Sequence, residues 1–322
     1  MTEIVVCGEA LIDFVPFTQT EGTHAGRLGY IPYPGGSPFN AAKAAARALE
    51  PGTGRRVGFA GAVSTDFFGA MLRRDLSAAG VDLSLLQTVP LNTTSAFVDF
   101  SGGSPAYAFH NAGTANERFD PAAGPALSAS TCWLHVGSVS LIDQPAADNI
   151  AAFAIAAAGE RLLSVDPNVR AGMINDPACW RARLDRLIAA AALVKLSDED
   201  LAYMAGPGGD AAAQAAALRA MGPSLVLVSE GARGVWALWS GGETRVPAPQ
   251  VSVVDTVGAG DTLMGACLAW LVDHGVSNRR ALDGLGQGDI ETMLAFATRA
   301  AALNCTQAGC NPPDWQTVVT NT

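Results

Sequence analysis

Short apolar runs rich in β-branched residues recur along the chain, and alanine-rich runs with helical spacing lie between them. This alternation is typical of strands joined by crossover helices. The clearest helical run, residues 66–79, carries Phe67, Phe68, Met71, Leu72 and Leu76 at helical spacing, and Gly80 is expected to end it. The predicted strands cover residues 4–7, 57–61, 133–136, 162–166, 193–196, 225–229 and 235–239. The pattern therefore predicts an α/β fold with a mainly parallel central sheet and helices on both faces.

One region departs from this alternation. Residues 95–100 and 106–110 alternate like two strands around Ser101-Gly-Gly-Ser104, which predicts a β-hairpin. Together with the loop-rich stretch 14–33, the hairpin is expected to form a small β-strand lid over the sheet edge, comprising about residues 14–33 and 92–112. We expect a single domain over residues 1–322, because the sequence shows no internal repeat and no low-complexity linker.

The charge balance limits the class of ligand. The chain has 322 residues, of which 49% are hydrophobic and 16% charged, and its net charge is -10. Such a chain offers no sequence-wide basic surface, so neither nucleic acid nor a membrane is expected as a partner. Any phosphate site must be local, built from oriented amides, a few arginines and Mg²⁺.

The cysteines and the N-terminus favour a cytoplasmic protein. The six cysteines show no C-x-x-C spacing, so neither a zinc site nor a disulfide framework is predicted. The N-terminus lacks a basic segment before an apolar core, and no apolar run approaches the roughly 18 residues of a membrane span. We therefore expect a reduced cytoplasmic protein.

The most specific chemistry lies in Asp255-Thr-Val-Gly-Ala-Gly-Asp-Thr262, between a β-branched segment and a helix-like stretch. The N–H groups of Gly258, Ala259 and Gly260 can approach a phosphate closely at a helix N-terminus, where the macrodipole favours negative charge. Asp261 adds nothing to phosphate affinity, which indicates a base that takes a proton from an attacking hydroxyl. The alternative is a glycine-rich turn that Asp261 only caps.

Two further segments could contact a polyol. Gly35-Gly-Ser-Pro-Phe-Asn40 predicts a helix start, with Ser37 as the N-cap and Pro38 at the first helical position. Asn40 could offer a donor and an acceptor to a hydroxyl, or it could be a surface capping residue. Asp13 follows the first strand, at the sheet edge where ligands gather, unless it is only a solvated loop residue.

Six segments together carry a family resemblance. They are Gly8-Glu-Ala-Leu-Ile-Asp13, Gly35-Gly36 to Asn40, Gly61-Ala-Val-Ser-Thr-Asp-Phe-Phe-Gly69, Asp166-Pro-Asn-Val-Arg170, Ser229-Glu-Gly-Ala-Arg-Gly234 and Asp255 to Asp261. Their order resembles the ribokinase-like (PfkB) carbohydrate kinases over nearly the whole chain, and within that family the chain looks most like bacterial fructokinases. The resemblance implies an ATP-dependent kinase that phosphorylates a primary hydroxyl of a neutral sugar, with fructose as the leading substrate.

The resemblance also implies a role for each matching residue. Asp261 would be the catalytic base, and Gly258, Ala259 and Gly260 would form the anion hole for the transferred phosphoryl group. Arg170 would help neutralise the phosphate, unless it is only an ion-pair partner. The implied substrate-binding residues are Asp13, Gly35, Gly36, Asn40, Phe97, Phe109, Asp166 and Asn168.

ATP and Mg²⁺ are the implied cofactors, with a monovalent cation such as K⁺ beside them. Asp200 matches the metal region, and Asp255 with the 305–313 loop matches the region of the monovalent cation. The residues that match nucleotide contacts are Lys195, Ser197, Ser229, Gly231, Gly234, Thr256 and Asn304.

The chain departs from the family pattern at two places. Many members carry Asn-x-x-Glu where this chain has Ser197 and Asp200, a shorter carboxylate that a water-bridged Mg²⁺ can tolerate. Relatives often place an arginine after a lid aromatic, whereas His110 follows Phe109 here. The missing arginine leaves no bidentate partner for a substrate carboxylate, which counts against 2-keto-3-deoxygluconate and favours a neutral hexose.

Three other functions stay open: a 2-keto-3-deoxygluconate kinase, a nucleoside kinase, and a non-catalytic sugar-binding sensor on the same fold. A nucleoside would favour an aromatic sandwich, and the lid aromatics Phe97, Phe100, Tyr107 and Phe109 suit either that role or ordinary packing. Retention of Asp261 beside the amide row argues against the sensor. An exposed hairpin edge can pair with its own copy, so a homodimer through the lid is a further hypothesis.

Overall fold

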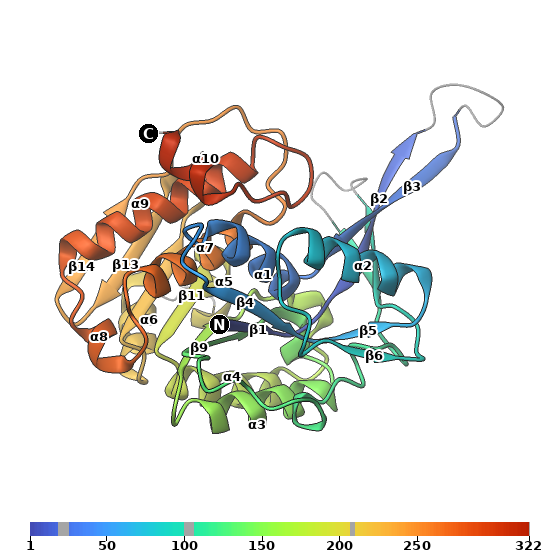
Figure 1. Ribbon diagram of the computed structural model, residues 1–322, viewed down its shortest axis with the longest axis horizontal. Helices are drawn as coiled ribbons and strands as arrows, with labels where there is room; N and C mark the ends of the chain where they lie inside the picture. The colour runs from blue at the N-terminus through green and yellow to red at the C-terminus, as the bar shows by residue number, and fades with distance from the viewer. Residues whose placement is uncertain (19–25, 100–105, 207–209, 322) are drawn as a thin grey trace.

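The computed structural model describes residues 1–18, 26–99, 106–206 and 210–321 (Figure 1). Its main sheet has eight strands in the order β14-β13-β12-β11-β10-β9-β1-β4. The strands from β4 to β12 in this order are parallel, and β13 and β14 are antiparallel. The bounds are β1 Thr2–Cys7, β4 Arg56–Ala60, β9 Trp133–Gly137, β10 Leu162–Asp166, β11 Leu193–Ser197, β12 Leu225–Ser229, β13 Val235–Trp239 and β14 Gly242–Val246. The predicted fold class and all seven predicted strands are confirmed.

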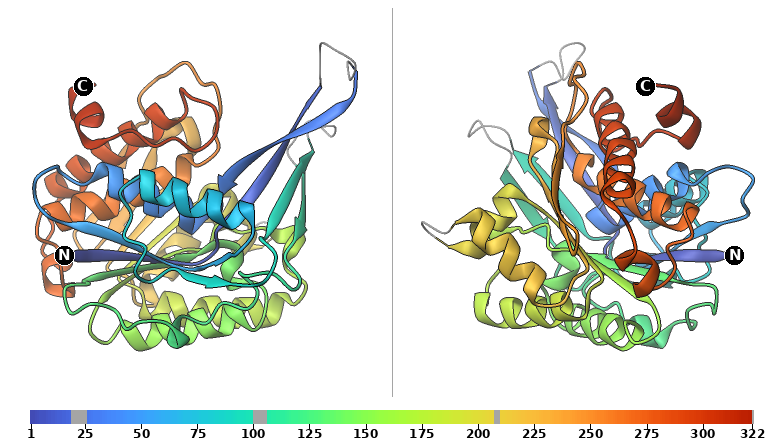
Figure 2. Two further views of the ribbon diagram at one scale, coloured as in Figure 1. Left: turned by 45° about the vertical axis from the view of Figure 1, so that its right-hand side comes forward. Right: turned by 90° about the vertical axis from the view of Figure 1, so that its left-hand side faces the viewer.

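Helices cover both faces of the main sheet (Figure 2). Both faces of β10 are buried, because Leu162 lies in the core on one side and Leu163 in the core on the other. This two-sided burial explains why the strands are continuous apolar runs. One face carries α1 Ser37–Ala48, α2 Phe67–Ala78, α7 Ala259–Asp273, α8 Arg279–Asp283, α9 Gln287–Asn304 and α10 Trp315–Thr320. The other carries α3 Ala146–Ala157, α4 Pro177–Ala190, α5 Asp198–Ala205 and α6 Ala211–Ala220.

A second sheet, which we call the lid sheet, projects from the body of the molecule (Figures 1 and 2). Its strand order is β3-β2-β7-β8. The strands are β2 Leu11–Thr18, β3 Leu28–Gly35, β7 Ser95–Asp99 and β8 Ala106–His110. β7 and β8 pair antiparallel, so the predicted hairpin is confirmed. Its connection, residues 100–105, lies outside the described residues.

The expectation of a loop-rich stretch at 14–33 is wrong for most of its described positions. β2 and β3 pair with each other along their full length. Prolines conceal the two strands in the sequence, although their positions are compatible with a sheet. Pro32 and Pro34 lie on the edge strand β3, and Pro16 lies beyond the three residues of β2 that pair with β7.

Short elements connect the two sheets. α2 begins as predicted, with Asp66 as the N-cap whose side chain accepts the N–H of Gly69 at 2.8 Å. Leu72 and Leu76 are buried, but Phe67 is 72% exposed, so the apolar face of α2 is narrower than predicted. β5 Ala62–Ser64 and β6 Gln87–Val89 form a separate parallel pair. Each strand has only three residues, which is too short to be predicted from the sequence pattern.

The helices α1 and α7 touch almost backbone to backbone. A Cβ on Gly265 of α7 would lie 2.6 Å from the carbonyl oxygen of Ala41 and 2.7 Å from the Cβ of Ala44, both on α1. Glycine facing alanine therefore allows an approach that larger side chains would prevent. This contact brings the first turns of the two helices together.

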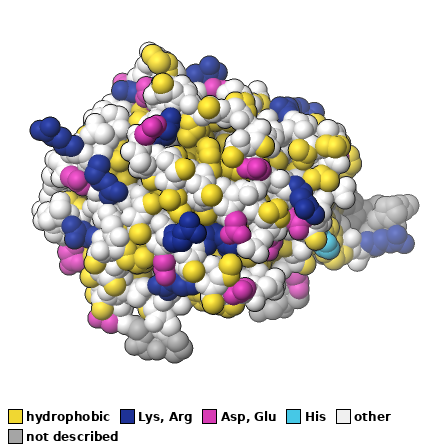
Figure 3. Space-filling model, turned by 90° about the horizontal axis from the view of Figure 1, so that it is seen from below, with side chains coloured by type: hydrophobic (Ala, Val, Ile, Leu, Met, Phe, Trp, Pro, Cys, Tyr) yellow, Lys and Arg dark blue, Asp and Glu magenta, His cyan; other side chains and the backbone are white. Residues whose placement is uncertain are grey.

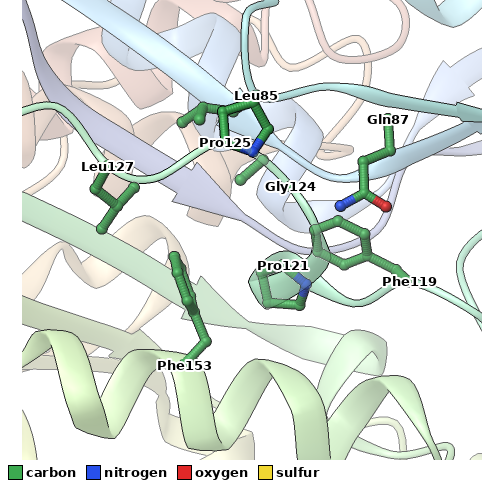
Figure 4. A pocket seen from close by; sticks show the side chains of 9 residues that line it. Leu85, Gln87, Phe119, Pro121, Gly124, Pro125, Leu127 and Phe153 are labelled. Atoms are coloured by element: carbon green, nitrogen blue, oxygen red, sulfur yellow. The ribbon is translucent and has the colours of Figure 1, made fainter.

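Two cavities lie outside this junction. The first, of about 10 Å³, has room for one water molecule at most, and Phe119, Pro121 and Phe153 are among its apolar lining residues (Figure 4). The second, of about 500 Å³, lies beside β7 and β8 and is lined by Asn92, Thr93, Ser95, Phe97, Phe109, His110, Asn111, Ala112 and Thr114. Basic and acidic side chains are interspersed on the face seen in Figure 3. Among the described helices, none combines the length and apolar character needed to cross a membrane.

Candidate active site

Asp261 lies in the first turn of α7, and two side chains of α1 hold its carboxylate. The Oγ of Ser37 donates to Oδ1 at 2.7 Å, and the Nδ2 of Asn40 donates to Oδ2 at 2.9 Å. Asp261 is 8% exposed. Each carboxylate oxygen has further acceptor capacity, so the group can still receive a proton from a hydroxyl.

The surroundings of Asp261 suit a general base. Burial raises the pKa of Asp261 above its ordinary value, while the hydrogen bonds from Ser37 and Asn40 and the ammonium of Lys195 act in the opposite direction. A base must be ionised near neutral pH and must still accept a proton in the transition state, so a raised pKa is favourable.

The start of α1 differs from its prediction. Gly36, with a φ of 104°, is the N-cap, and Ser37 and Pro38 are the first two helical residues. The N–H of Ser37 donates to Oε1 of Glu9 at 3.2 Å, and Oε2 of Glu9 accepts the N–H of Ser140 at 3.1 Å. The buried Glu9 carboxylate thus replaces the serine cap, and the Ser37 hydroxyl is available to hold Asp261.

The start of α7 is an open turn. Gly258, the N-cap, has a φ of 75°, and a Cβ there would lie 2.3 Å from the Sγ of Cys310, so this position requires glycine. The N–H groups of Gly258 and Gly260 have no acceptor within the described ranges. The N–H of Ala259 donates to the carbonyl oxygen of Thr256 at 3.2 Å. The prediction of an open amide at Ala259 is therefore wrong in this structure, because the 256–259 turn closes on itself.

Asp13 joins the site from β2. Its Oδ2 lies 2.1 Å from the position of a Cβ on Gly35, so the carboxylate rests against the glycine backbone. Burial raises the pKa of Asp13 to about 6, and the charges of Arg170, which lowers it, and of Asp261, which raises it, also act on this group. Asp13 therefore lies against Gly35 and within reach of the charges of Arg170 and Asp261, and the roles that the resemblance implies for these residues stay predictions.

The lid sheet presents an aromatic pair on the same face as Asp13. Phe109 lies opposite Ala96 on β7, and Ala96 pairs with Asp13 on β2. Tyr107 stacks on Phe109 with 5.7 Å between the ring centroids, and burial and Asp13 raise its pKa. Tyr107 was not among the candidate sugar contacts, although its place two residues from Phe109 puts it on the same face of the strand.

Phe97 lies on the opposite face of the lid sheet. It stacks on Phe14 with 4.7 Å between the ring centroids, and Phe14 packs edge-on against Phe68 of α2 at 5.4 Å. Phe97 and Phe109 therefore do not share a face of the sheet, and the implied contact of Phe97 with a sugar stays a prediction.

Asp166 and Lys195 form a buried ion pair beneath the α7 turn. Their Oδ2 and Nζ atoms are 2.8 Å apart, and the side chains are 1% and 5% exposed. Each of the two side chains thus has the other as its partner, and the implied contacts of Asp166 with a sugar and of Lys195 with a nucleotide stay predictions. Asn168 follows with a φ of 39°, and its Oδ1 accepts the Nη1 of Arg170 at 2.6 Å.

Ser197 and Asp200 cap α5. The Oγ of Ser197 accepts the N–H of Asp200, and Oδ2 of Asp200 accepts the N–H of Ser197, both at 3.0 Å. Oδ1 of Asp200 accepts the N–H of Val169 at 2.8 Å. No group of three or more His, Cys, Asp or Glu side chains in the described ranges is arranged to hold a metal ion. The contact of Asp200 with a metal ion stays a prediction.

The turn after β12 contains Ser229, Gly231 and Gly234. Gly231 and Gly234 have φ values of 59° and 100°. A Cβ on Gly234 would lie 2.0 Å from the carbonyl oxygen of Val246, so close packing explains this glycine. The nucleotide contacts of these three residues stay predictions.

Asp255 and Asn304 fix the loops around the α7 turn. Oδ1 of Asp255 accepts the N–H of Val257 at 3.0 Å, and Oδ2 accepts the N–H of Gly309 at 2.8 Å. Asn304 is fully buried at 0% exposure, and its Nδ2 donates to the carbonyl oxygen of Val257 at 2.8 Å. The implied contacts of Asn304 and of the exposed Thr256 with a nucleotide stay predictions.

Comparisons with a family model and with known proteins return carbohydrate kinases. The model of the pfkB family of carbohydrate kinases matches residues 1–317. A fructokinase of Rhizobium leguminosarum bv. trifolii is 37% identical over 284 residues, which cover 88% of this chain and 84% of the relative. A fructokinase of Klebsiella pneumoniae is 35% identical over 303 residues, covering 92% and 94%.

Solved structures give the same result. The fructokinase of Xylella fastidiosa with bound ATP superposes with a TM-score of 0.88 at 27% identity and covers 99% of this chain and 97% of its own. The fructokinase of Vibrio cholerae O395 in its fructose, ADP and calcium ion bound form has a TM-score of 0.82 at 27% identity, covering 99% and 98%.

Proposed function

The chain belongs to the pfkB family of carbohydrate kinases, and we propose that it transfers the γ-phosphate of ATP to a primary hydroxyl of fructose. The observation that carries this proposal is the junction of α1 and α7. There a buried carboxylate, Asp261, is hydrogen-bonded to Ser37 and Asn40 beside an open helix N-terminus.

Each part of the junction has a step to perform. Asp13, with Gly35 and Asn40 near it, binds and orients the sugar hydroxyls. Asp261 takes the proton of the attacking hydroxyl. The N–H groups of Gly258 and Gly260 stabilise the negative charge that develops on the transferred phosphoryl group, and Arg170 adds positive charge at the rim.

Fructose is favoured over the alternative acceptors. The two sequence relatives described above are fructokinases, and one of the solved fructokinase structures holds fructose and ADP. Against 2-keto-3-deoxygluconate, the described lid strands place no arginine beside Phe109. A base sandwich between Phe97 and Phe109 is not available, because the rings lie on opposite faces of the lid sheet. The retained base argues against a sensor.

ATP use requires a metal ion, and we propose Mg²⁺. The ion would be held by phosphate oxygens and water and would neutralise the phosphate charge. Asp200 would reach it through a water molecule. A monovalent cation near Asp255 and the 305–313 loop is a further proposal, supported by the structure of a relative that holds a potassium ion. A different structure of that same relative, the Vibrio cholerae O395 fructokinase, holds a calcium ion.

We also propose that the lid sheet closes over bound sugar and that two copies pair through it. Phe17, Leu28, Tyr30 and Ile31 are apolar and exposed on the projecting strands β2 and β3, which supports an interface. Sedimentation at micromolar concentration tests the dimer, and a monomer there would contradict it.

All six cysteines are free, which suits the reducing cytoplasm as the place of action.

Asp261→Asn tests the proposal directly. The variant should lose about 100- to 10,000-fold in kcat, because an amide cannot take the proton, while fructose and ATP still bind. ADP release in a coupled assay measures turnover over fructose, other hexoses, ketodeoxygluconate and nucleosides, and calorimetry measures binding. Near-normal turnover by the variant would show that Asp261 is not the base.

A further inference from the structure

A buried ammonium group lies on the sheet side of the α7 turn, where the proposed reaction gathers negative charge. Lys195 extends from β11, and its Nζ pairs with Oδ2 of Asp166 at 2.8 Å. The same Nζ lies 2.8 Å from the position of a Cβ on Gly260. Gly260 therefore lets the turn rest directly on the ammonium group.

The charges around Lys195 keep it positive. Burial disfavours the charge, but Asp166, Asp261 and Asp200 outweigh burial and hold the pKa of Lys195 above its ordinary value. His135 on the neighbouring strand β9 bonds to Ser164 at 3.0 Å, and burial and Lys195 lower its pKa to about 3. His135 is thus neutral, and Lys195 supplies the positive charge on the sheet side of the α7 turn.

We propose that Lys195 is a positioning residue for phosphoryl transfer: its charge keeps the Asp261 carboxylate ionised and supports the anion-binding turn from beneath, while Asp166 holds the charge in place. This inference rests on the proposed function, since it assigns Lys195 a role relative to Asp261 as the base. Gly260 covers the ammonium group, so Lys195 acts through its electric field. Such a field is strong because little water separates the groups.

Paired substitutions separate a field effect from a structural one. Asp166→Asn removes the counter-charge, and Lys195→Met removes the ammonium while keeping much of its volume. The base works only when ionised, so kcat falls as pH drops through the pKa of Asp261. The acidic limb should move down by about one pH unit in D166N and up by about one in K195M.

The double variant K195M/D166N removes both charges and avoids leaving one buried partner unpaired. Its acidic limb should lie above that of the wild type, because Lys195 acts more strongly on Asp261 than Asp166 does. The other charged or titratable groups around Asp261 and Lys195 are the same in every variant. They are Asp13, Lys43, His135, Arg170, Asp200, Cys267 and Cys310.

Shifts in opposite directions for D166N and K195M support the inference. Shifts in the same direction, or unmoved limbs with a lower kcat throughout, overturn it, because a merely structural role changes the rate and not the limb. If K195M does not fold, the two other variants decide the question. An acidic limb at lower pH than the wild type in D166N and at higher pH in the double variant supports the inference.

A second readout does not need turnover. Carbon-13 NMR of protein labelled in aspartate carboxyl groups, with D261N identifying the signal, measures the pKa of Asp261 in each variant. The inference is supported if the pKa of Asp261 is lowest in D166N, intermediate in the wild type and highest in the double variant. Any other order overturns it. Turnover retained by D261N would sink the proposed base, while this order would still decide the role of Lys195.

Discussion

Two helices start at the active site, and they start in different ways. α1 and α7 each begin after a glycine with positive φ, 104° and 75°, and neither N-cap supplies a side-chain hydrogen bond. At α1 the N–H of Ser37 meets the Glu9 carboxylate. At α7 the N–H groups of Gly258 and Gly260 meet no acceptor in the described part of the chain.

The difference shows how one helix start becomes a scaffold and another an anion site. A helix N-terminus attracts negative charge. At α1 the carboxyl group of Glu9 occupies this position and accepts the N–H of Ser37, so this end contributes only side chains, Ser37 and Asn40, to the chemistry. At α7 no carboxylate of the described residues accepts the N–H groups of Gly258 and Gly260, and we propose that these two amides bind the phosphoryl group.

The largest effect should come from disturbing the open end. Gly260→Ala places a Cβ 2.8 Å from the Nζ of Lys195 and shifts the turn, so kcat should fall by about 100-fold, the usual cost of a lost oxyanion donor. Steady-state kinetics measure the loss. Gly288→Ala on α9 is the matched control, because a Cβ there meets nothing within 4 Å. A kcat within twofold of wild type in G260A would show that the turn is not the anion site.

A smaller effect should come from the scaffold end. Ser37→Ala removes the hydroxyl that donates to Asp261 at 2.7 Å, and loss of a charge-assisted hydrogen bond should lower kcat by about tenfold. That bond lowers the pKa of Asp261, so its removal raises the pKa and moves the acidic limb of kcat to higher pH. Ser252→Ala, at an exposed position, is the control. An unmoved limb in S37A would separate Ser37 from the base.

The smallest effect should appear in stability and not in rate. Burial raises the pKa of Glu9 from the ordinary 4.5 to about 7 in the folded protein. Between pH 4.5 and about 7 the folded state holds a proton that the unfolded state releases. The free energy of unfolding should therefore fall as pH rises through this range, by at most about 1.4 kcal/mol per pH unit.

Glu9→Gln cannot ionise and should lack this decline. Urea unfolding of both proteins at pH 5, 6 and 7 measures the difference between the two slopes. Parallel slopes would mean that Glu9 stays ionised throughout, and the filled end of α1 would then carry a permanent charge.

The main sheet could be predicted from the sequence because its strands are buried on both faces and read as unbroken apolar runs. β2 and β3 could not, since the pairing that tolerates Pro16, Pro32 and Pro34 depends on which strand edges are open. Phe97 and Phe109 were grouped by type, but the register of β7 against β8 separates them.

The site followed the same division. Asp261 and Asp13 could be predicted because folding alone rarely requires a carboxylate beside glycines at the end of a strand. Glu9 was overlooked, although it stands directly after Gly8 at the end of β1, because only the fold reveals that two distant N–H groups converge on it. Lys195 and Asn304 were assigned ligand contacts from the resemblance alone, and the sequence did not reveal that both side chains are buried.

The hydrogen bond between Ser37 and Asp261 joins residues 224 positions apart. A nascent chain that has not yet reached α7 already contains Asp13, Ser37 and Asn40 but lacks Asp261. The carboxylate can therefore join the site only after most of the chain has been synthesised.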